Sequence, residues 1–280
     1  MTAPLELPQP RTPAGQAGLA ALLANPSRAL LAFDFDGVLS PIIDDPARAA
    51  AHPGAIPALA RLAPHVGALA IVTGRSVAQV LQLGRFADEP ALARLLVAGH
   101  YGLERWSASS GEIASPPPFP GVAAARQALP GLLNDLVAPA GTAVEDKGHS
   151  VAVHFRNTPS PADAQELLTE PLTTLARSHG LAVQPGRMVV ELRPPDMDKG
   201  ATLGALVLEV GAEVVTFAGD DLGDLPAYDA VDSLRESGMP GLLICSASDE
   251  VRALSDRADL VLDGPARVVA FLETLASRWG

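Results

Sequence analysis

The sequence predicts an α/β fold, a doubly wound parallel-sheet (Rossmann-like) core with an inserted α+β cap domain. Short continuous apolar runs alternate with helix-period segments near both ends of the chain, a pattern typical of strands buried on both faces and joined by helices. The middle of the chain instead contains a strand with alternating apolar and polar residues. The 280 residues suffice for about two domains, and 48% apolar against 19% charged residues excludes a disordered chain.

Three buried strands are expected in the first third of the chain. They are residues 29–33 (ALLAF), 67–72 (GALAIV) and 94–99 (RLLVAG), each a short apolar run. A helix is expected at about residues 53–63, because apolar residues recur there at helical spacing. A second helix is expected to open near Ser76.

The middle of the chain is expected to form a separate unit. A Pro-rich segment at 115–121 (SPPPFPG) interrupts the core pattern, and a helix follows it to about Val137. Residues 150–155 (SVAVHF) and 187–194 (RMVVELRP) are expected strands, with a helix at 161–178 between them. This βαββαβ-like order suits a small α+β unit.

The core pattern resumes near the C-terminus. The expected elements are strands at 212–219 (AEVVTFAG), 241–245 (GLLIC) and 258–262 (ADLVL), and a last helix at 266–278. The resulting division is a flexible tail at 1–14, a core formed by 15–104 and 194–280, and a cap at 105–193.

The charge balance disfavours two classes of partner. The chain has 20 basic and 32 acidic residues, a net charge of −12, which repels nucleic-acid backbones and anionic membrane surfaces. No segment has the roughly 18 uncharged apolar residues of a membrane helix, and the N-terminus lacks the pattern of a secretory signal. The single cysteine, Cys245, permits no internal disulfide, as in a reducing compartment. We expect a cytoplasmic protein with a small-molecule partner, and we favour a monomer, although the sequence does not determine the oligomeric state.

Lysine is rare in this chain. Only Lys147 and Lys199 occur among the 20 basic residues, and the other 18 are arginines. A chain with this preference retains lysine where a compact, mobile ammonium is needed, or by chance.

The strongest chemical signal is FDFDGVLSPI at residues 33–42. Asp34 and Asp36 follow an expected strand two residues apart, so side-chain alternation projects both carboxylates to one side. The carboxyl ends of strands form the ligand crevice in open α/β sheets, and a set of oxygen ligands favours Mg²⁺. A polar loop that simply follows a strand is the alternative for this motif alone.

Three later segments lie at comparable positions. IVTGRS (71–76) places the Thr73 hydroxyl and the Gly74 N–H where they can bind a phosphoryl oxygen, with Arg75 at the opening of a helix whose N-terminus favours anions. DMDKG (196–200) sets Lys199 at a helix start. GDDLGD (219–224) follows a strand with three carboxylates, a costly arrangement unless it binds metal, and it does not match the calcium-loop pattern.

Together, these four motifs resemble those of the haloacid dehalogenase-like superfamily of phosphohydrolases. The segments VAGHYGLE (97–104), EDKGHSVAVHFR (145–156) and GRMVVELRP (186–194) narrow the resemblance to the trehalose-6-phosphate phosphatase family. The resemblance covers residues 29 to about 230. It implies a hydrolase core with a mobile cap and a Mg²⁺-dependent phosphatase that acts through an aspartyl-phosphate.

The resemblance also implies roles for individual residues. The catalytic set is the nucleophile Asp34, the acid/base Asp36, and two residues that bind the phosphoryl oxygens, Thr73 and Lys199, with Gly74 and Arg75 beside them. Mg²⁺ is expected on Asp34, the Asp36 carbonyl and Asp220. Of Asp221 and Asp224, one is expected to ligate the metal and the other to orient Lys199.

The cap is expected to recognise the sugar. By the same resemblance, Glu145, Lys147 and Glu191 bind the distal glucose hydroxyls of a sugar-phosphate substrate. His154 and Arg156 lie on the same hairpin, and they either add sugar contacts or form a cross-strand pair.

The chain departs from the family pattern at a few positions. The family usually has Thr at Val38 and at Gly223, Glu at Leu225, and a Ser-His pair at positions 100 and 101. None of these changes removes a core catalytic group, but they leave the identity of the sugar open. The alternatives are a phosphatase for another sugar phosphate (sucrose phosphate, glucosyl-3-phosphoglycerate) and a non-catalytic sugar-phosphate sensor, which would not need both aspartates of the first motif.

Overall fold

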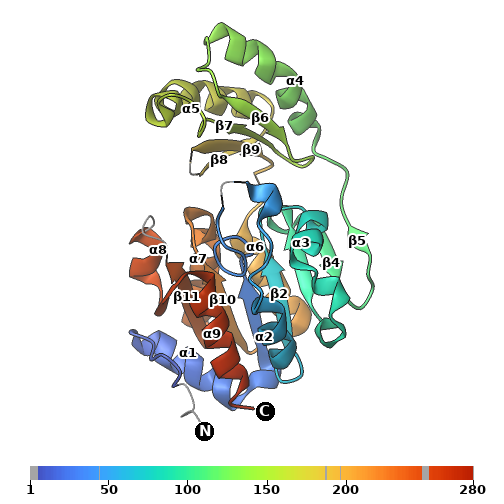
Figure 1. Cartoon of the computed structure of the whole chain (residues 1–280), viewed down its shortest axis with the longest axis vertical. Coiled ribbons are helices and arrows are strands. Elements are labelled where there is room, and N and C mark those ends of the chain that lie inside the picture. Colours follow the sequence, from blue (N-terminus) through green and yellow to red (C-terminus); the bar gives the residue numbers. More distant parts are fainter. Residues whose placement is uncertain (1–5, 44, 187, 196, 248–251, 280) are drawn as a thin grey trace. The chain divides into compact units, whose positions relative to one another are not determined.

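The chain forms two compact units in a computed structural model that describes residues 6–43, 45–186, 188–195, 197–247 and 252–279 (Figure 1). One unit, the core unit, comprises Met1–Ser115 and Asp198–Gly280, and the other, the inserted unit, comprises Pro116–Met197. The chain therefore leaves the core once and returns to it once.

The core unit is built on an eight-stranded sheet with the order β12-β11-β10-β1-β2-β3-β4-β5. The strands from β12 to β3 are all parallel, and β4 and β5 add an antiparallel edge. Their bounds are β1 Ala29–Phe33, β2 Ala68–Val72, β3 Leu96–Gly99, β4 Glu104–Ser107, β5 Ile113–Ala114, β10 Val214–Gly219, β11 Gly241–Ala247 and β12 Leu260–Asp263.

Helices cover both faces of this sheet. Along β1, Leu31 and Phe33 join one hydrophobic cluster, whereas Leu30 and Ala32 join another, so the strand is buried on both faces. The first cluster includes residues of α1 (Pro13–Ala24), α2 (Ala55–Leu62), α3 (Val77–Gly84) and α9 (Gly264–Ala276). The second includes residues of α6 (Lys199–Val210), α7 (Leu225–Glu236) and α8 (Arg252–Arg257). The predicted doubly wound parallel sheet is confirmed.

Short 3-10 helices complete the core unit. They are η1 Pro26–Arg28, η2 Pro46–Arg48, η3 Phe86–Asp88, η4 Pro90–Leu92, η5 His100–Gly102 and η6 Leu222–Asp224.

The boundaries differ from those expected from the sequence. Strand β4 pairs antiparallel with β3, with Trp106 opposite Val97, so the segment after residue 104 belongs to the core and not to the cap. Its sequence, ERWS, has no apolar run to announce a strand. Part of the expected tail is also attached to the core, because Arg11 donates hydrogen bonds to the Ala258 carbonyl and Thr12 bonds to Asp259.

The inserted unit combines two helices with a four-stranded antiparallel sheet of order β6-β7-β9-β8. In chain order the elements are α4 Pro120–Asp135, β6 Ala143–Asp146, β7 Val151–His154, α5 Pro161–Ser178, β8 Ala182–Gly186 and β9 Val189–Arg193. The predicted α+β class is correct, but the βαββαβ-like order is wrong, because the order is αββαββ. The missed strands β6 and β8 are both edges, one fully exposed and the other containing Pro and Gly.

We expect Gly18→Ala to destabilise the core unit. A Cβ on Gly18 would lie 1.9 Å from the Gly241 carbonyl oxygen, so α1 would have to move away from β11. Overpacking of this kind costs about 1–3 kcal/mol of unfolding free energy. The matched control is Gly204→Ala in α6, where a Cβ meets nothing within 4 Å and a gain of about 0.4–1 kcal/mol is expected. Urea denaturation followed by circular dichroism measures both, and equal effects would contradict the close packing of α1.

Candidate active site

The candidate site lies where three parallel strands end and one helix begins. Strand β1 lies between β10 and β2, so the residues that follow these strands come together at one edge of the sheet. Asp34 follows β1, Thr73 follows β2 and Asp220 follows β10, and Lys199 is the first residue of α6. The side chains of all four are buried.

Lys199 joins two of the strand-end loops. Its Nζ lies 2.7 Å from Asp34 Oδ2 and 2.7 Å from Asp224 Oδ1. The start of α6 is fixed by Asp198, whose side chain accepts hydrogen bonds from the N–H groups of Gly200 and Ala201. The ammonium is therefore held at a defined place beside Asp34.

Both carboxylate oxygens of Asp224 accept hydrogen bonds that hold Lys199 and the acidic loop in place. One oxygen binds Lys199, and the other accepts hydrogen bonds from the N–H groups of Asp220 and Asp221 at 2.9 and 3.2 Å. Asp224 is completely buried, and it packs so closely on Gly219 that a Cβ there would lie 2.5 Å from its carboxyl carbon. Of the two acidic residues that the sequence left open, Asp224 is the one that contacts Lys199.

The centre contains more negative charge than its one ammonium balances. Asp34, Asp220, Asp221 and Asp224 each place a carboxylate oxygen within 4.8 Å of the others. Burial raises the pKa of Asp34 well above its ordinary value, and the Lys199 ammonium opposes that rise only in part. Burial, followed by repulsion from Asp34, does the same to the pKa of Asp220.

Lys199 stays charged in these surroundings. Burial alone would lower the pKa of its ammonium, but the carboxylates of Asp224 and Asp34 outweigh burial and raise the pKa well above its ordinary value. The ammonium can therefore attract an anionic group to Asp34.

The unbalanced carboxylates fit a divalent cation. No residue in the described ranges donates a hydrogen bond to the buried Asp220 carboxylate. Beside it lies Gly37 (φ +69°), where a Cβ would fall 2.1 Å from Asp220 Oδ2, so only glycine leaves that oxygen accessible. The Ser246 hydroxyl holds the Gly37 loop by donating to its carbonyl oxygen at 2.5 Å. An all-oxygen donor set with excess negative charge suits a hard divalent metal ion.

Asp36 and Arg75 lie in the loops that follow β1 and β2. The Asp36 carboxylate is outside the four-carboxylate cluster and is paired with the Arg75 guanidinium instead. Three N–H groups of Arg75 bind the Asp36 carboxylate and the Pro46 carbonyl. Thr73 lies as expected at the strand end, and its hydroxyl oxygen accepts a hydrogen bond from the Arg75 N–H.

The segment after β3 supports the Thr73–Arg75 turn. His100 and Tyr101 both adopt left-handed backbone conformations (φ 46° and 55°), and their N–H groups donate to the Arg75 and Thr73 carbonyls at 2.8 Å. The N–H of Val77, at the start of α3, donates to the Glu104 carboxylate at 2.7 Å. The anion at this helix N-terminus is therefore a side chain of the protein, a partner that sequence reasoning missed.

The polar residues of the inserted unit share one face of its sheet. Glu145, Ala152, Glu191 and Gln184 lie opposite one another across the four strands, so they project to the same side. The alternate residues, such as Val151, Val153, Val190 and Leu192, pack with α4 and α5 in a hydrophobic cluster. We call the first side the polar face of the inserted unit.

Two short networks organise this polar face. Glu191 is buried and accepts hydrogen bonds from Lys147 Nζ at 3.0 Å and from the Ser150 hydroxyl at 2.5 Å. His154 Nε2 lies 2.8 Å from a carboxylate oxygen of Glu145 on the neighbouring strand β6. Arg156 follows the end of β7 in an exposed turn, so strand alternation does not place it on this face.

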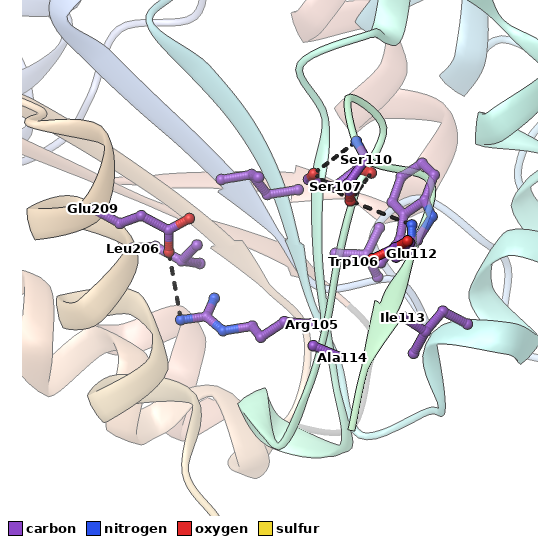
Figure 2. Close-up of a pocket in the computed structure, with 11 residues that line it drawn as sticks. Arg105, Trp106, Ser107, Ser110, Glu112, Ile113, Ala114, Leu206 and Glu209 are labelled. Carbon is purple, nitrogen blue, oxygen red and sulfur yellow. Dashed lines mark hydrogen bonds and ion pairs between the residues drawn. The ribbon is translucent and has the colours of Figure 1, made fainter. Parts of the chain in front are cut away.

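A separate pocket of about 270 Å³ lies at the other end of β3 and β4 (Figure 2). Its lining includes Leu96, Ser107 and Leu206, and one pair of opposite charges, Arg105 and Glu209, 3.9 Å apart. Leu96 begins β3 and Ser107 ends the antiparallel β4, so the pocket is remote from the strand ends that carry the carboxylates.

The fold is that of a class of proteins, the haloacid dehalogenase-like hydrolases. A solved haloacid dehalogenase-like hydrolase from Bacteroides thetaiotaomicron shares the fold at a TM-score of 0.58 and 17% identity, over 88% of this chain and 98% of that one.

The chain belongs to the trehalose-phosphatase family, whose family model matches residues 32–260. A trehalose-phosphate phosphatase of Mycolicibacterium paratuberculosis is 34% identical over 252 residues, or 88% of this chain and 61% of the relative. One from Mycobacterium tuberculosis is 34% identical over 250 residues, covering 87% and 60%. The chain thus spans about 61% of the length of the first of these relatives. The solved C-terminal domain of a Candida albicans trehalose-6-phosphate phosphatase has a TM-score of 0.76 at 20% identity, over 98% of this chain and 99% of that one.

We expect Asp220→Asn to stabilise the metal-free protein and to remove its response to divalent cations. The amide removes one of several like charges buried together, which corresponds to about 1 kcal/mol, or a rise of roughly 2–4 °C in the midpoint of thermal unfolding. Thermal unfolding with and without millimolar Mg²⁺ measures both effects. Asp135→Asn, at an exposed position of α4, is the control that leaves the Mg²⁺ response intact. A lower midpoint for the metal-free Asp220→Asn protein would contradict this account of the charge.

Proposed function

We propose that the chain hydrolyses trehalose 6-phosphate to trehalose and inorganic phosphate, through an aspartyl-phosphate on Asp34. The observation that carries the proposal is the buried Asp34 carboxylate with the Lys199 ammonium 2.7 Å from it, in a chain of the trehalose-phosphatase family. A carboxylate held beside a cation at a strand end is positioned to attack a phosphorus atom that the same cation attracts.

The chain's own residues supply most of this chemistry. Asp34 attacks phosphorus in line with the leaving sugar oxygen, while Lys199 and Thr73 hold the phosphoryl oxygens as their charge shifts. Asp36 protonates the leaving sugar oxygen and then takes a proton from the water that hydrolyses the aspartyl-phosphate. Asp224 acts through Lys199, because it contacts the ammonium and the acidic loop and is closed off from solvent.

We infer that Mg²⁺ is the cofactor, held by Asp34 and Asp220 with the Asp36 carbonyl. When bound, it neutralises the repulsion between the Asp34 carboxylate and an incoming phosphate group. Asp221 is the remaining carboxylate available to it, since Asp224 is occupied by Lys199 and two N–H groups.

The polar face of the inserted unit is the proposed sugar-binding surface. Glu191, Lys147 and Glu145 offer carboxylate acceptors and an ammonium donor on one side of a sheet, which suits the many hydroxyls of a disaccharide. The Glu191 carboxylate is held by two donors, so its orientation is fixed before any sugar binds.

The proposed protein is a monomeric cytoplasmic enzyme whose partner is this small substrate, without nucleic acid or membrane. The net charge of −12 supports the exclusion of polyanionic partners. Among the helices in the described part of the chain, none has both the length and the apolar character needed to cross a bilayer.

We expect Asp34→Asn to lower phosphate release from trehalose 6-phosphate by about 10⁴-fold or more, because the amide cannot form the acyl-phosphate. The experiment measures phosphate release from a panel of sugar phosphates, including glucose 6-phosphate, sucrose phosphate and glucosyl-3-phosphoglycerate, with the Asp34→Asn protein as the blank. Circular dichroism confirms that the variant is folded. If the wild-type protein hydrolyses another sugar phosphate of the panel with a higher kcat/KM, the proposal that trehalose 6-phosphate is the substrate is wrong.

We expect Glu191→Gln to lower kcat/KM for the sugar phosphate but not for a substrate without a sugar. The amide keeps the shape but removes the charge-assisted hydrogen bonds, so kcat/KM for trehalose 6-phosphate falls about 10–100-fold. Cleavage of 4-nitrophenyl phosphate, which has no sugar, stays within about threefold of wild type on the same reasoning. Glu166→Gln, an exposed residue of α5, is the control that changes neither activity. Equal losses for both substrates would contradict a role in sugar recognition.

A further inference from the structure

Arg75 and Asp36 form an ion pair in which the guanidinium binds both carboxylate oxygens. Arg75 Nε lies 2.6 Å from Asp36 Oδ2, and Arg75 Nη2 lies 2.6 Å from Asp36 Oδ1. A planar guanidinium that binds both oxygens of a carboxylate fixes its plane as well as its distance. The pair therefore sets the orientation of the carboxyl group.

The guanidinium is itself held in place. Arg75 Nη1 donates to the Pro46 carbonyl at 2.9 Å, and the guanidinium carbon lies 5.7 Å from the centre of the Phe35 ring. The Arg75 side chain is only 12% exposed, and its backbone N–H binds the Thr73 hydroxyl. Arg75 thus contacts Thr73 in its own turn, Phe35 in the first aspartate motif and Pro46 in the segment that follows that motif.

We propose that Arg75 is a positioning residue that acts through Asp36, orienting the carboxyl group for proton transfer to the leaving oxygen. This inference rests on the proposed function. The Asp36 side chain is 36% exposed, whereas the Arg75 side chain is largely covered, so Asp36 is the more accessible member of the pair. A carboxyl group has further lone-pair positions beyond the two that the guanidinium occupies, and these remain for the transferred proton.

The step that depends on this orientation is the first one. The Asp34 oxygen forms a bond to phosphorus as the bond from phosphorus to the sugar oxygen breaks, and Asp36 gives its proton to that oxygen. A basic sugar alkoxide needs the proton as it leaves, whereas an acidic phenol leaves as its anion without one. The contribution of Asp36, and of any residue acting through it, therefore depends on the basicity of the leaving group.

The experiment compares Arg75→Gln with wild type on a series of phosphate esters. The substrates are 2,4-dinitrophenyl phosphate, 4-nitrophenyl phosphate, phenyl phosphate and trehalose 6-phosphate, in order of increasing leaving-group basicity. We measure kcat/KM, which covers only the steps up to departure of the leaving group. The expected result is a loss of about 10²-fold for the last two substrates, because a misplaced catalytic group loses about that factor. For 2,4-dinitrophenyl phosphate the expected loss is less than about threefold, since no proton is needed there.

Two further variants sharpen the test. Arg75→Lys keeps the charge but cannot bind both oxygens, so the same leaving-group dependence is expected with a smaller loss. In an Asp36→Asn background, Arg75→Gln is expected to cause no further loss on any substrate, because residues that act as one unit are not additive. Arg85→Lys, in an exposed pair with Asp88, is the matched control and leaves every kcat/KM unchanged.

The outcomes separate the two proposals. Equal losses on all substrates, or a further loss in the Asp36→Asn background, would overturn the positioning role and indicate that Arg75 binds the phosphoryl group directly. No loss on any substrate would also overturn it. A wild-type protein that cleaves none of the esters would instead refute the proposed function.

Discussion

The rest of the core site depends on the buried ion pairs of the Lys199 ammonium with Asp34 and Asp224. The ammonium joins the loop after β1 to the loop after β10, two segments far apart in the sequence but adjacent in the sheet. Without its charge, the buried carboxylates around it would repel one another without compensation. The Asp198 cap on α6 and the two N–H groups that bind Asp224 therefore serve one end, which is to keep this cation in place.

Several features that destabilise an ordinary fold are collected at this edge of the sheet. Four carboxylates share a small volume, and His100 and Tyr101 are held in left-handed conformations that non-glycine residues rarely adopt. Hydrogen bonds to the Thr73 and Arg75 carbonyls maintain that conformation. The strain and the excess charge lie at the edge of the sheet where the parallel strands end. The apolar clusters on the two faces of the sheet provide the stability that offsets this strain and charge repulsion.

The sequence predicted the parts of the fold that depend on continuous apolar runs. Strands β1, β2 and β10, and with them the places of Asp34, Thr73 and Asp220, follow from strands buried on both faces. The edge strands β6 and β8, and β4 next to the edge strand β5, were missed because strands with little burial leave a weak apolar pattern. Spacing also could not reveal that Arg75 pairs with Asp36 or that Glu104 binds the Val77 N–H, because tertiary contacts decide which donor meets which acceptor. A polar residue just after the expected strand at 241–245 was the available signal for Ser246, which lies within β11 in the structure.

The second crossing of the chain between the two units falls between Met197 and Asp198, immediately before Lys199. The connection between the two units therefore ends within two residues of Lys199. There the Asp198 side chain accepts hydrogen bonds from the N–H groups of Gly200 and Ala201 and so fixes the first turn of α6. The ion pairs of Lys199 with Asp34 and Asp224, like this cap, lie within the core unit, so the ammonium is fixed by the unit that the chain has just re-entered.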